Sequence, residues 1–174
     1  MSFFNRLKYL VKNQSAYSSD FVGASTLKKA RNILTIQNKH LFSASDMSAY
    51  QKTIDLIVKK IIKRDRSHRY YIGKKNENIE AAKRTIYKYE SFCTSNIKVT
   101  PNTKNGFDLY VENIYLGQVP KELNPDMRHY LQTSMMTAFA YIKGGPYKYY
   151  NEEQHVVIEE EKEPFDLSIY IQFS

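Results

Sequence analysis

The stretch NGFDLYVENIYLGQVPKEL, residues 105–123, combines two alternating runs of apolar and polar residues with a proline and a helical pattern. The first run covers residues 107–111, and the second resumes the alternation at residues 114–116. Successive side chains of a strand point to opposite faces of a sheet, so each run predicts a strand with one buried face. The two residues between the runs, 112–113, can form a tight hairpin turn, and we therefore expect an antiparallel pair.

This hairpin is expected to place Tyr110 and Tyr115 together on the outward face, because both occupy polar positions of the alternation. After the second run, Gly117 is expected to end the strand where the backbone must bend without a Cβ atom. Pro120 then sets φ just before a helix. The apolar pattern predicts this helix over residues 123–131.

The rest of the second half continues the alternation, and its last strand is the most regular of the chain. Apolar residues occupy every other position of FDLSIYIQF, residues 165–173, which is the pattern of a half-buried strand. We interpret the acidic run at residues 159–163 as a solvated loop before this strand. Further patterns predict strands at residues 68–73, 96–101 and 136–143 and a helix at residues 77–92.

Helical periodicity dominates the first 65 residues, where serines are suitably placed to cap helices. Helices are predicted over residues 3–11, 25–37 and 45–64. The polar side of the third helix is basic, which is typical of an ordinary solvated face and also suits a nucleic-acid backbone. This side carries Lys52, Lys59, Lys60, Lys63 and Arg64.

The change of period near residues 64–68 predicts two regions. We expect a helical region over residues 1–65 and an α+β domain over residues 66–174, in which the strands form a small barrel or sheet with two helices. The pattern leaves open whether the first region is a separate unit or packs on the sheet.

Charge is unevenly distributed along the 174 residues. Residues 1–65 carry 12 Lys or Arg against 4 acids (net +8), residues 66–150 carry 13 against 7 (net +6), and residues 151–174 carry 1 against 7 (net −6). A long basic body attracts polyanions such as nucleic acid, since many modest charges add to a substantial field. A compositional bias is the alternative, because Lys, Asn, Ile and Tyr are abundant together.

The composition also indicates the cellular compartment in which we expect the protein. A single cysteine, Cys93, excludes an internal disulfide framework and is typical of a reducing compartment, so we expect a cytoplasmic protein. No stretch approaches the roughly 18 apolar residues of a membrane span, and the amino terminus lacks the pattern of a signal peptide. We therefore expect a soluble protein that has no membrane partner.

The order of these pieces resembles the HIRAN domain, a small β-rich module found alone in bacteria and phages and at the front of some eukaryotic helicase-like DNA-repair proteins. The resemblance covers residues 67–174, and KGGPYKYY followed by FDLSIYIQF is similar to the closing piece of stand-alone members. One departure is that the family's segment rich in Asn and Asp is reduced to NTKNGFDLYV, with Asp108 where the family has alanine. The strand-to-helix motif of the family matches IYLGQVPKEL at Gly117, Val119, Pro120 and Glu122.

The resemblance implies binding of DNA, notably the 3′ end of a single strand, through aromatic stacking and basic contacts. Such a site needs rings for bases, cations for phosphates and donors for a terminal hydroxyl. Tyrosine also fits a half-buried strand, so packing is the alternative role of each candidate ring. The candidate nucleic-acid-binding residues are Arg69, Tyr70, Tyr71, Lys74, Lys75, Tyr110, Tyr115, Lys143, Tyr147, Lys148 and Tyr149.

Catalytic signals are weak, and we expect a protein without enzyme activity, cofactor or metal. Ser25 with Lys28, and Ser95 with Lys98, have the spacing of a serine–lysine pair, but neither has a partner motif. The four histidines are scattered outside metal-ligand spacing, and none adjoins the cysteine.

The alternative to DNA binding is a phage or mobile-element product that binds and modulates a host protein. The amphipathic segment at residues 3–11 could then dock in a groove of that partner.

Overall fold

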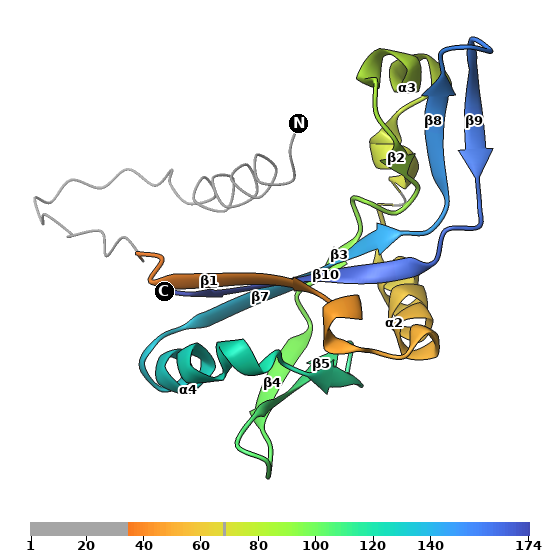
Figure 1. Cartoon of the computed structure of the whole chain (residues 1–174). Helices are drawn as coiled ribbons and strands as arrows, with labels where there is room; N and C mark the ends of the chain where they lie inside the picture. The colour runs from red at the N-terminus through yellow and green to blue at the C-terminus, as the bar shows by residue number, and fades with distance from the viewer. Residues whose placement is uncertain (1–34, 68) are drawn as a thin grey trace, which may run out of the picture. The chain divides into compact units, whose positions relative to one another are not determined.

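The computed structural model describes residues 35–67 and 69–174. In this part of the chain, strands and helices form an α+β arrangement, which confirms the expected fold class (Figure 1). The strands belong to three separate antiparallel sheets, and residues from 34 onward group into one compact unit. The helix predicted over residues 3–11 lies outside the described residues, as do the first ten residues of the one predicted over 25–37.

The largest sheet has the order β1-β10-β7-β3 and is antiparallel throughout. Its long central strands, β7 (Met136–Gly144) and β10 (Phe165–Phe173), confirm the two predictions made there. On one side, β1 (Asn38–Ser43) pairs with β10, and on the other, the short β3 (Cys93–Thr94) pairs with β7. The alternating residues of β10 that are fully buried are Leu167, Ile169, Ile171 and Phe173.

A second sheet contains the predicted hairpin. It consists of β4 (Ile97–Pro101), β5 (Phe107–Val111) and β6 (Ile114–Gln118), in that order. Glu112 and Asn113 form the turn with φ values of 53° and 61°, as a two-residue hairpin turn of this kind requires. The second strand continues through its glycine for one more residue, so the expected end point was one residue early.

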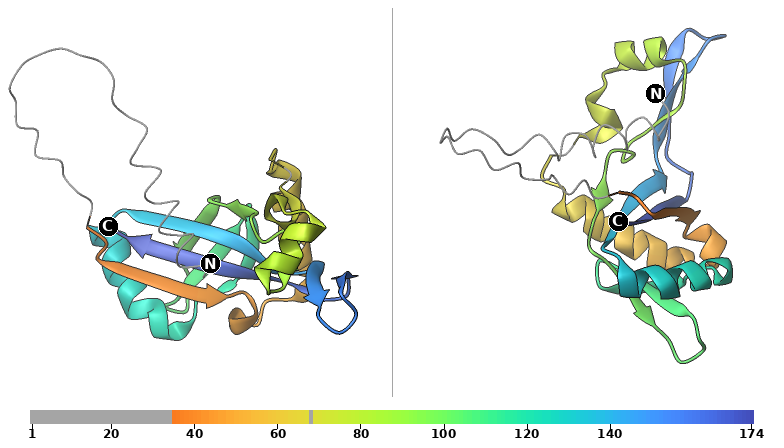
Figure 2. Two further views of the ribbon diagram at one scale, coloured as in Figure 1. Left: turned by 90° about the horizontal axis from the view of Figure 1, so that it is seen from above. Right: turned by 90° about the vertical axis from the view of Figure 1, so that its left-hand side faces the viewer.

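One core joins these two sheets with two helices (Figure 2). Helix α2 (Gln51–Arg64) lies against β10 and β6, because its apolar residues recur at helical spacing on one side. Helix α4 (Asn124–Thr133) begins after the short 3₁₀ turn η3 (Lys121–Leu123) and buries Met127 completely. Both helices confirm predictions, although the first begins at residue 51, after a separate 3₁₀ turn, η1 (Ser45–Met47).

The third sheet has the order β2-β8-β9 and a small core of its own. It consists of β2 (Ile86–Tyr87), β8 (Tyr147–Asn151) and β9 (Val156–Glu160). One face is covered by α3 (Asn76–Ala82) and by the 3₁₀ segment η2 (Tyr70–Gly73). The fully enclosed residues of this core are Tyr71, Ile79 and Ile86.

Three expectations for local structure were wrong. The strand predicted at 68–73 is instead a turn in which Tyr71 and Ile72 adopt left-handed backbone conformations, since the Tyr71 N–H bonds the carbonyl of Lys88 rather than a neighbouring strand. The helix predicted over 77–92 ends at residue 82, because Lys83 takes a left-handed conformation and the chain continues into β2. Part of the acidic run at 159–163 belongs to β9.

Two expectations for the larger organisation also need correction. The three sheets are open and are not closed into a barrel, because the two edge strands of each sheet do not pair with one another. Residues 38–43 form a strand rather than part of a helical region, and that strand pairs with the last strand of the chain. The change of period near residues 64–68 therefore does not separate two units, because residues on both sides of it share one core.

Candidate nucleic-acid interface

The outer face of the β4–β5–β6 sheet carries two of the predicted tyrosines side by side. Tyr110 on β5 is paired with Tyr115 on β6, and their ring centroids are 5.5 Å apart. Their neighbours in the strands, Leu109 and Leu116, point into the core, so alternation turns both rings outward. Tyr115 is 47% exposed.

A lysine completes this outward row. Lys98 on β4 is the register partner of Tyr110, and its side chain is exposed. One carboxylate, Asp108, also lies on this face and accepts a hydrogen bond of 3.0 Å from Asn102. Burial, the charge of Asp108 and the neighbouring Tyr110 raise the pKa of Tyr115 above its ordinary value, so this hydroxyl stays protonated and can donate. We call Lys98, Tyr110 and Tyr115 the tyrosine–lysine row.

Helix α2 brings further cations to the turn at the end of this row. The Nζ atom of Lys60 lies 3.3 Å from the carbonyl oxygen of Glu112, and Arg64 Nη1 lies 2.5 Å from the Glu112 carboxylate. Glu112 itself is 4% exposed and also accepts hydrogen bonds from Thr94 and Asn96. Desolvation opposes its ionisation, but these hydrogen bonds and the arginine charge lower the pKa of Glu112 below its ordinary value.

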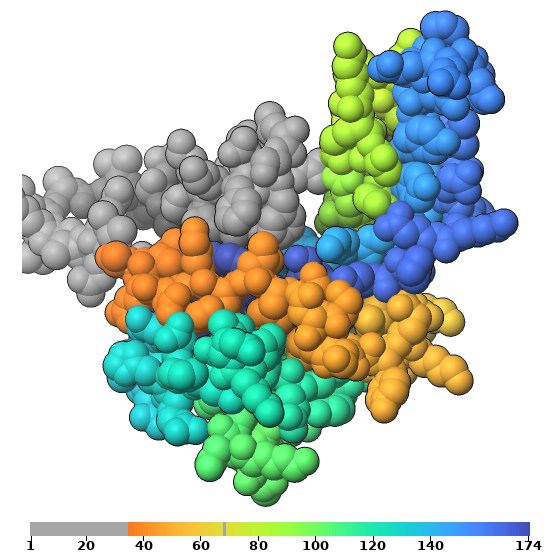
Figure 3. All heavy atoms as spheres, viewed as in Figure 1, coloured from red at the N-terminus to blue at the C-terminus, as the bar shows by residue number. Residues whose placement is uncertain are grey.

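The outward side of α2 is basic, as the sequence predicted. Ile54, Ile57, Val58 and Ile61 face the core, which leaves the lysines on the opposite side of the helix. Figure 3 shows α2, in gold, at the surface of the described unit. The exposed lysines of this side are Lys52, Lys59, Lys60 and Lys63.

The predicted segment around residues 69–75 is divided between surface and interior. Tyr71 is buried, and its hydroxyl donates a hydrogen bond to Glu159. Burial and this carboxylate raise the pKa of Tyr71 above its ordinary value. Tyr70 remains 39% exposed, although its ring stacks on Phe92 at 5.7 Å. The cations of the segment, Arg69, Lys74 and Lys75, are exposed.

The predicted cluster around residues 143–149 is divided between the two faces of the third sheet. Lys148 lies on the covered face, 3.3 Å from Glu159 and 4.7 Å from the centroid of the Tyr71 ring. Tyr147 and Tyr149 lie on the opposite face, next to acidic residues described below. Lys143, on β7, is exposed and is the register partner of Asp166. The structure therefore brings Tyr71 and Lys148 together on a covered face, and it brings Tyr110 and Tyr115 together on an outward face in register with Lys98.

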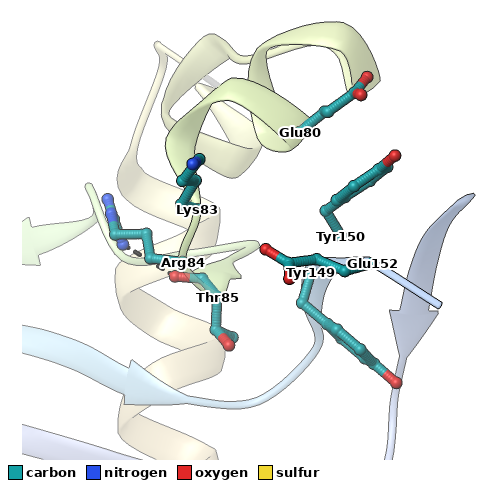
Figure 4. Close-up of a pocket in the computed structure, with 7 residues that line it drawn as sticks. All are labelled: Glu80, Lys83, Arg84, Thr85, Tyr149, Tyr150 and Glu152. Atoms are coloured by element: carbon teal, nitrogen blue, oxygen red, sulfur yellow. Dashed lines mark hydrogen bonds between the residues drawn. The ribbon is translucent and has the colours of Figure 1, made fainter. Parts of the chain in front are cut away.

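A shallow cavity of about 360 Å³ lies between the end of α3 and the β8–β9 hairpin (Figure 4). Its charged residues oppose one another, since Glu80 and Glu152 lie with Lys83 and Arg84. Arg84 is already held by Glu90 at 2.9 Å. The cavity is lined by Glu80, Lys83, Arg84, Thr85, Tyr149, Tyr150 and Glu152, none of which is an activated nucleophile.

Other reactive groups are equally dispersed. Desolvation and the charge of Asp65 raise the pKa of Cys93, which disfavours its nucleophilic thiolate form. Within residues 35–67 and 69–174, no group of three His, Cys, Asp or Glu residues could hold a metal ion. The Nε2 atom of His40 lies 3.4 Å from Asp126, and Asn38 of β1 donates a hydrogen bond of 2.8 Å to the same carboxylate of α4. The Ser25–Lys28 pair lies outside the described residues.

Comparisons with protein-family models, with curated proteins and with solved structures find no match for this chain. Among the helices in the described part of the chain, none combines the length and the apolar character needed to span a membrane.

Proposed function

We propose that this chain is a non-enzymatic nucleic-acid-binding protein that holds single-stranded DNA on the outer face of the β4–β5–β6 sheet. The observation that carries the proposal is the pair of outward rings, Tyr110 and Tyr115, with Lys98 in the same row. Bases of a single strand can stack on such rings, and the lysine can pair with a phosphate.

Apart from Asp108, which accepts a hydrogen bond from Asn102, the charged groups around the row support a polyanionic ligand. Lys60 and Arg64 approach the adjacent turn, and the neighbouring side of α2 presents further lysines to solvent. Glu112, the acid closest to these cations, is buried and neutralised by its own partners. A strand that crosses the tyrosine pair could therefore extend toward α2 without meeting an exposed acid of the turn.

Single strands are favoured over duplexes because stacking on a protein ring requires an unstacked base. The resemblance of residues 67–174 to the HIRAN domain supports the same ligand class, and we include a HIRAN-like assignment of this part in the proposal. The separate basic residues near Tyr70 could contact the ends of a longer strand.

Fluorescence anisotropy with a labelled single strand of about 12 nucleotides tests the proposal directly. We expect binding that weakens as salt rises from about 50 to about 200 mM. Replacing Tyr110 or Tyr115 by leucine should weaken binding by about fivefold to a hundredfold, since stacking of one base contributes about 1–3 kcal/mol. Tyr50→Leu is the matched control, because Tyr50 is 83% exposed and lies at the other end of α2.

Absence of binding at low salt, or equal effects of the three tyrosine variants, would contradict the proposal. Circular dichroism of each variant separates a lost contact from a lost fold. Since both rings of the row are at the surface, leucine should leave the core intact.

A further inference from the structure

The outer face of the β2–β8–β9 sheet carries a second group of tyrosines, which no described helix covers. Tyr87 and Tyr147 are register partners, and Tyr149 lies two residues further along β8. The ring centroids of Tyr87 and Tyr147 are 5.5 Å apart, and those of Tyr147 and Tyr149 are 6.1 Å apart. Figure 4 shows that Tyr149 points away from Tyr150, which turns toward α3. We call the three rings Tyr87, Tyr147 and Tyr149 the tyrosine face.

Carboxylates, rather than cations, lie beside these rings. Glu160 is the register partner of Tyr147, so both point to the same side of the sheet. The hydroxyl of Tyr87 donates a hydrogen bond of 3.1 Å to Glu163. Desolvation and the charges of Glu160 and Glu163 raise the pKa of Tyr147 above its ordinary value, in agreement with the position of these acids.

The available cation of this sheet points the other way. Lys148 alternates with Tyr147 and Tyr149 along β8, and it is engaged by Glu159 on the covered face. Lys162 is the one basic residue in the acidic stretch 151–174, whose net charge is −6. Phosphates approaching the tyrosine face would therefore be repelled, which makes this surface a poor site for nucleic acid.

Rings combined with carboxylates are suited to a cation. The faces of tyrosine rings attract a guanidinium group, which also pairs with carboxylates through its planar set of donors. β9 is an edge strand of its sheet, and an extended peptide can align along such an edge. We propose that the tyrosine face, with Glu160 and Glu163, binds an extended arginine-rich segment of a partner protein. This surface lies on a different sheet from the tyrosine–lysine row and does not depend on DNA binding there.

A labelled peptide of about 12 residues that alternates arginine and serine is the probe, and fluorescence anisotropy at low salt measures its affinity for the full chain. The protein as a whole carries +8, so its net charge should repel this basic peptide and oppose nonspecific binding. Any binding therefore reports a local acidic surface. A peptide of the same length with glutamate in place of arginine is the matched negative probe.

Substitutions of the acids and of one ring of the tyrosine face test the proposed contacts. The double change Glu160→Gln with Glu163→Gln should weaken binding of the arginine peptide roughly tenfold, and Tyr147→Leu should weaken it roughly fivefold. Tyr147→Phe should retain binding, because the ring and not its hydroxyl contacts the guanidinium. Glu122→Gln, on the exposed turn η3, removes a carboxylate elsewhere and should leave the affinity unchanged.

Each result has a definite meaning. If the arginine peptide fails to bind, or binds all variants equally, the inference is wrong. If Tyr147→Leu weakens the binding of single-stranded DNA and not the binding of the peptide, the tyrosine face is a nucleic-acid site and the inference is also wrong. If Tyr147→Leu proves misfolded by circular dichroism, the two glutamine changes decide the matter alone, because they preserve side-chain size.

Discussion

Glu112 shows how one side chain can connect elements that are distant in the sequence. It lies in the β5–β6 turn, yet its carboxylate is bonded by Arg64 of α2, by Thr94 of β3 and by Asn96. A buried carboxylate is stable only when such donors replace the lost water. These contacts fix the turn beside the basic side of α2 and so position the tyrosine–lysine row.

Glu112→Gln should destabilise the fold by about 1–3 kcal/mol at neutral pH, because an amide cannot accept from all three donors. The lowered pKa in the folded state means that this stabilisation is present above the ordinary value of 4.5 and is lost as pH falls through the folded-state value. Urea unfolding at several pH values should therefore show a difference between wild type and variant that shrinks below about pH 4.5. A difference that stays constant with pH would contradict this account.

Two glycines with nearly the same backbone conformation permit a matched test of steric contact. Gly145 has φ of +75°, and a Cβ atom there would lie 2.1 Å from the ring of Phe165. Gly73 has φ of +72°, but a Cβ there would meet nothing within 4 Å. Gly73→Ala should cost about 1 kcal/mol from backbone strain alone, and Gly145→Ala about 1–3 kcal/mol more, as measured by thermal unfolding. Equal losses would mean that Phe165 moves aside freely.

At the scale of elements, the two cores differ greatly in size. The core between the four-stranded sheet and the β4–β5–β6 sheet encloses most of the buried residues, whereas the β2–β8–β9 sheet and α3 enclose only Tyr71, Ile79 and Ile86. The free energy of local unfolding is lowest where few apolar contacts are buried. Amide exchange should therefore be faster in β8 and β9 than in β7 and β10.

Tyr71→Phe tests this difference. The change removes the hydrogen bond to Glu159 and should cost about 1 kcal/mol, since a net hydrogen bond contributes about that much. Exchange measured by mass spectrometry should accelerate in α3, β8 and β9, while β1 and β10 keep their protection. Uniform acceleration across all strands would show that the elements unfold as one unit.

The sequence predicted those elements whose patterns are local. β10 and the hairpin of β5 and β6 show regular alternation, and one face of each is buried as that alternation implies. β1 has no such pattern, and pairing with β10, more than 100 residues later, determines its structure. β8 is composed mainly of tyrosine and lysine, and β9 has three apolar residues followed by two glutamates, so neither strand shows an alternation of apolar and polar residues.

At the scale of the whole described unit, the candidate site could be predicted only in part. The sequence could propose tyrosines as candidate ligand residues but could not assign them to surfaces, since that depends on which strands pair. Tyr71 is buried and Tyr147 lies beside acids, whereas Tyr110 and Tyr115 lie on one outward face in register with Lys98. The approach of Lys60 and Arg64 to Glu112, in the turn next to that pair, has no signal in the local pattern, because it joins residues about 50 positions apart in the sequence.

The distribution of charge gives the last prediction. If single-stranded DNA extends from the tyrosine–lysine row along α2, replacing Lys59 and Lys63 by glutamine should reduce the salt slope of log K by about 1.4, at about 0.7 per released phosphate contact. Replacing Lys83 and Lys162 by glutamine removes the same charge from the β2–β8–β9 side and should leave the slope unchanged. Anisotropy titrations over a range of salt measure both slopes. Equal reductions would mean that the strand responds to the net charge of the protein, and the ordered path from the tyrosine pair to α2 would have to be abandoned.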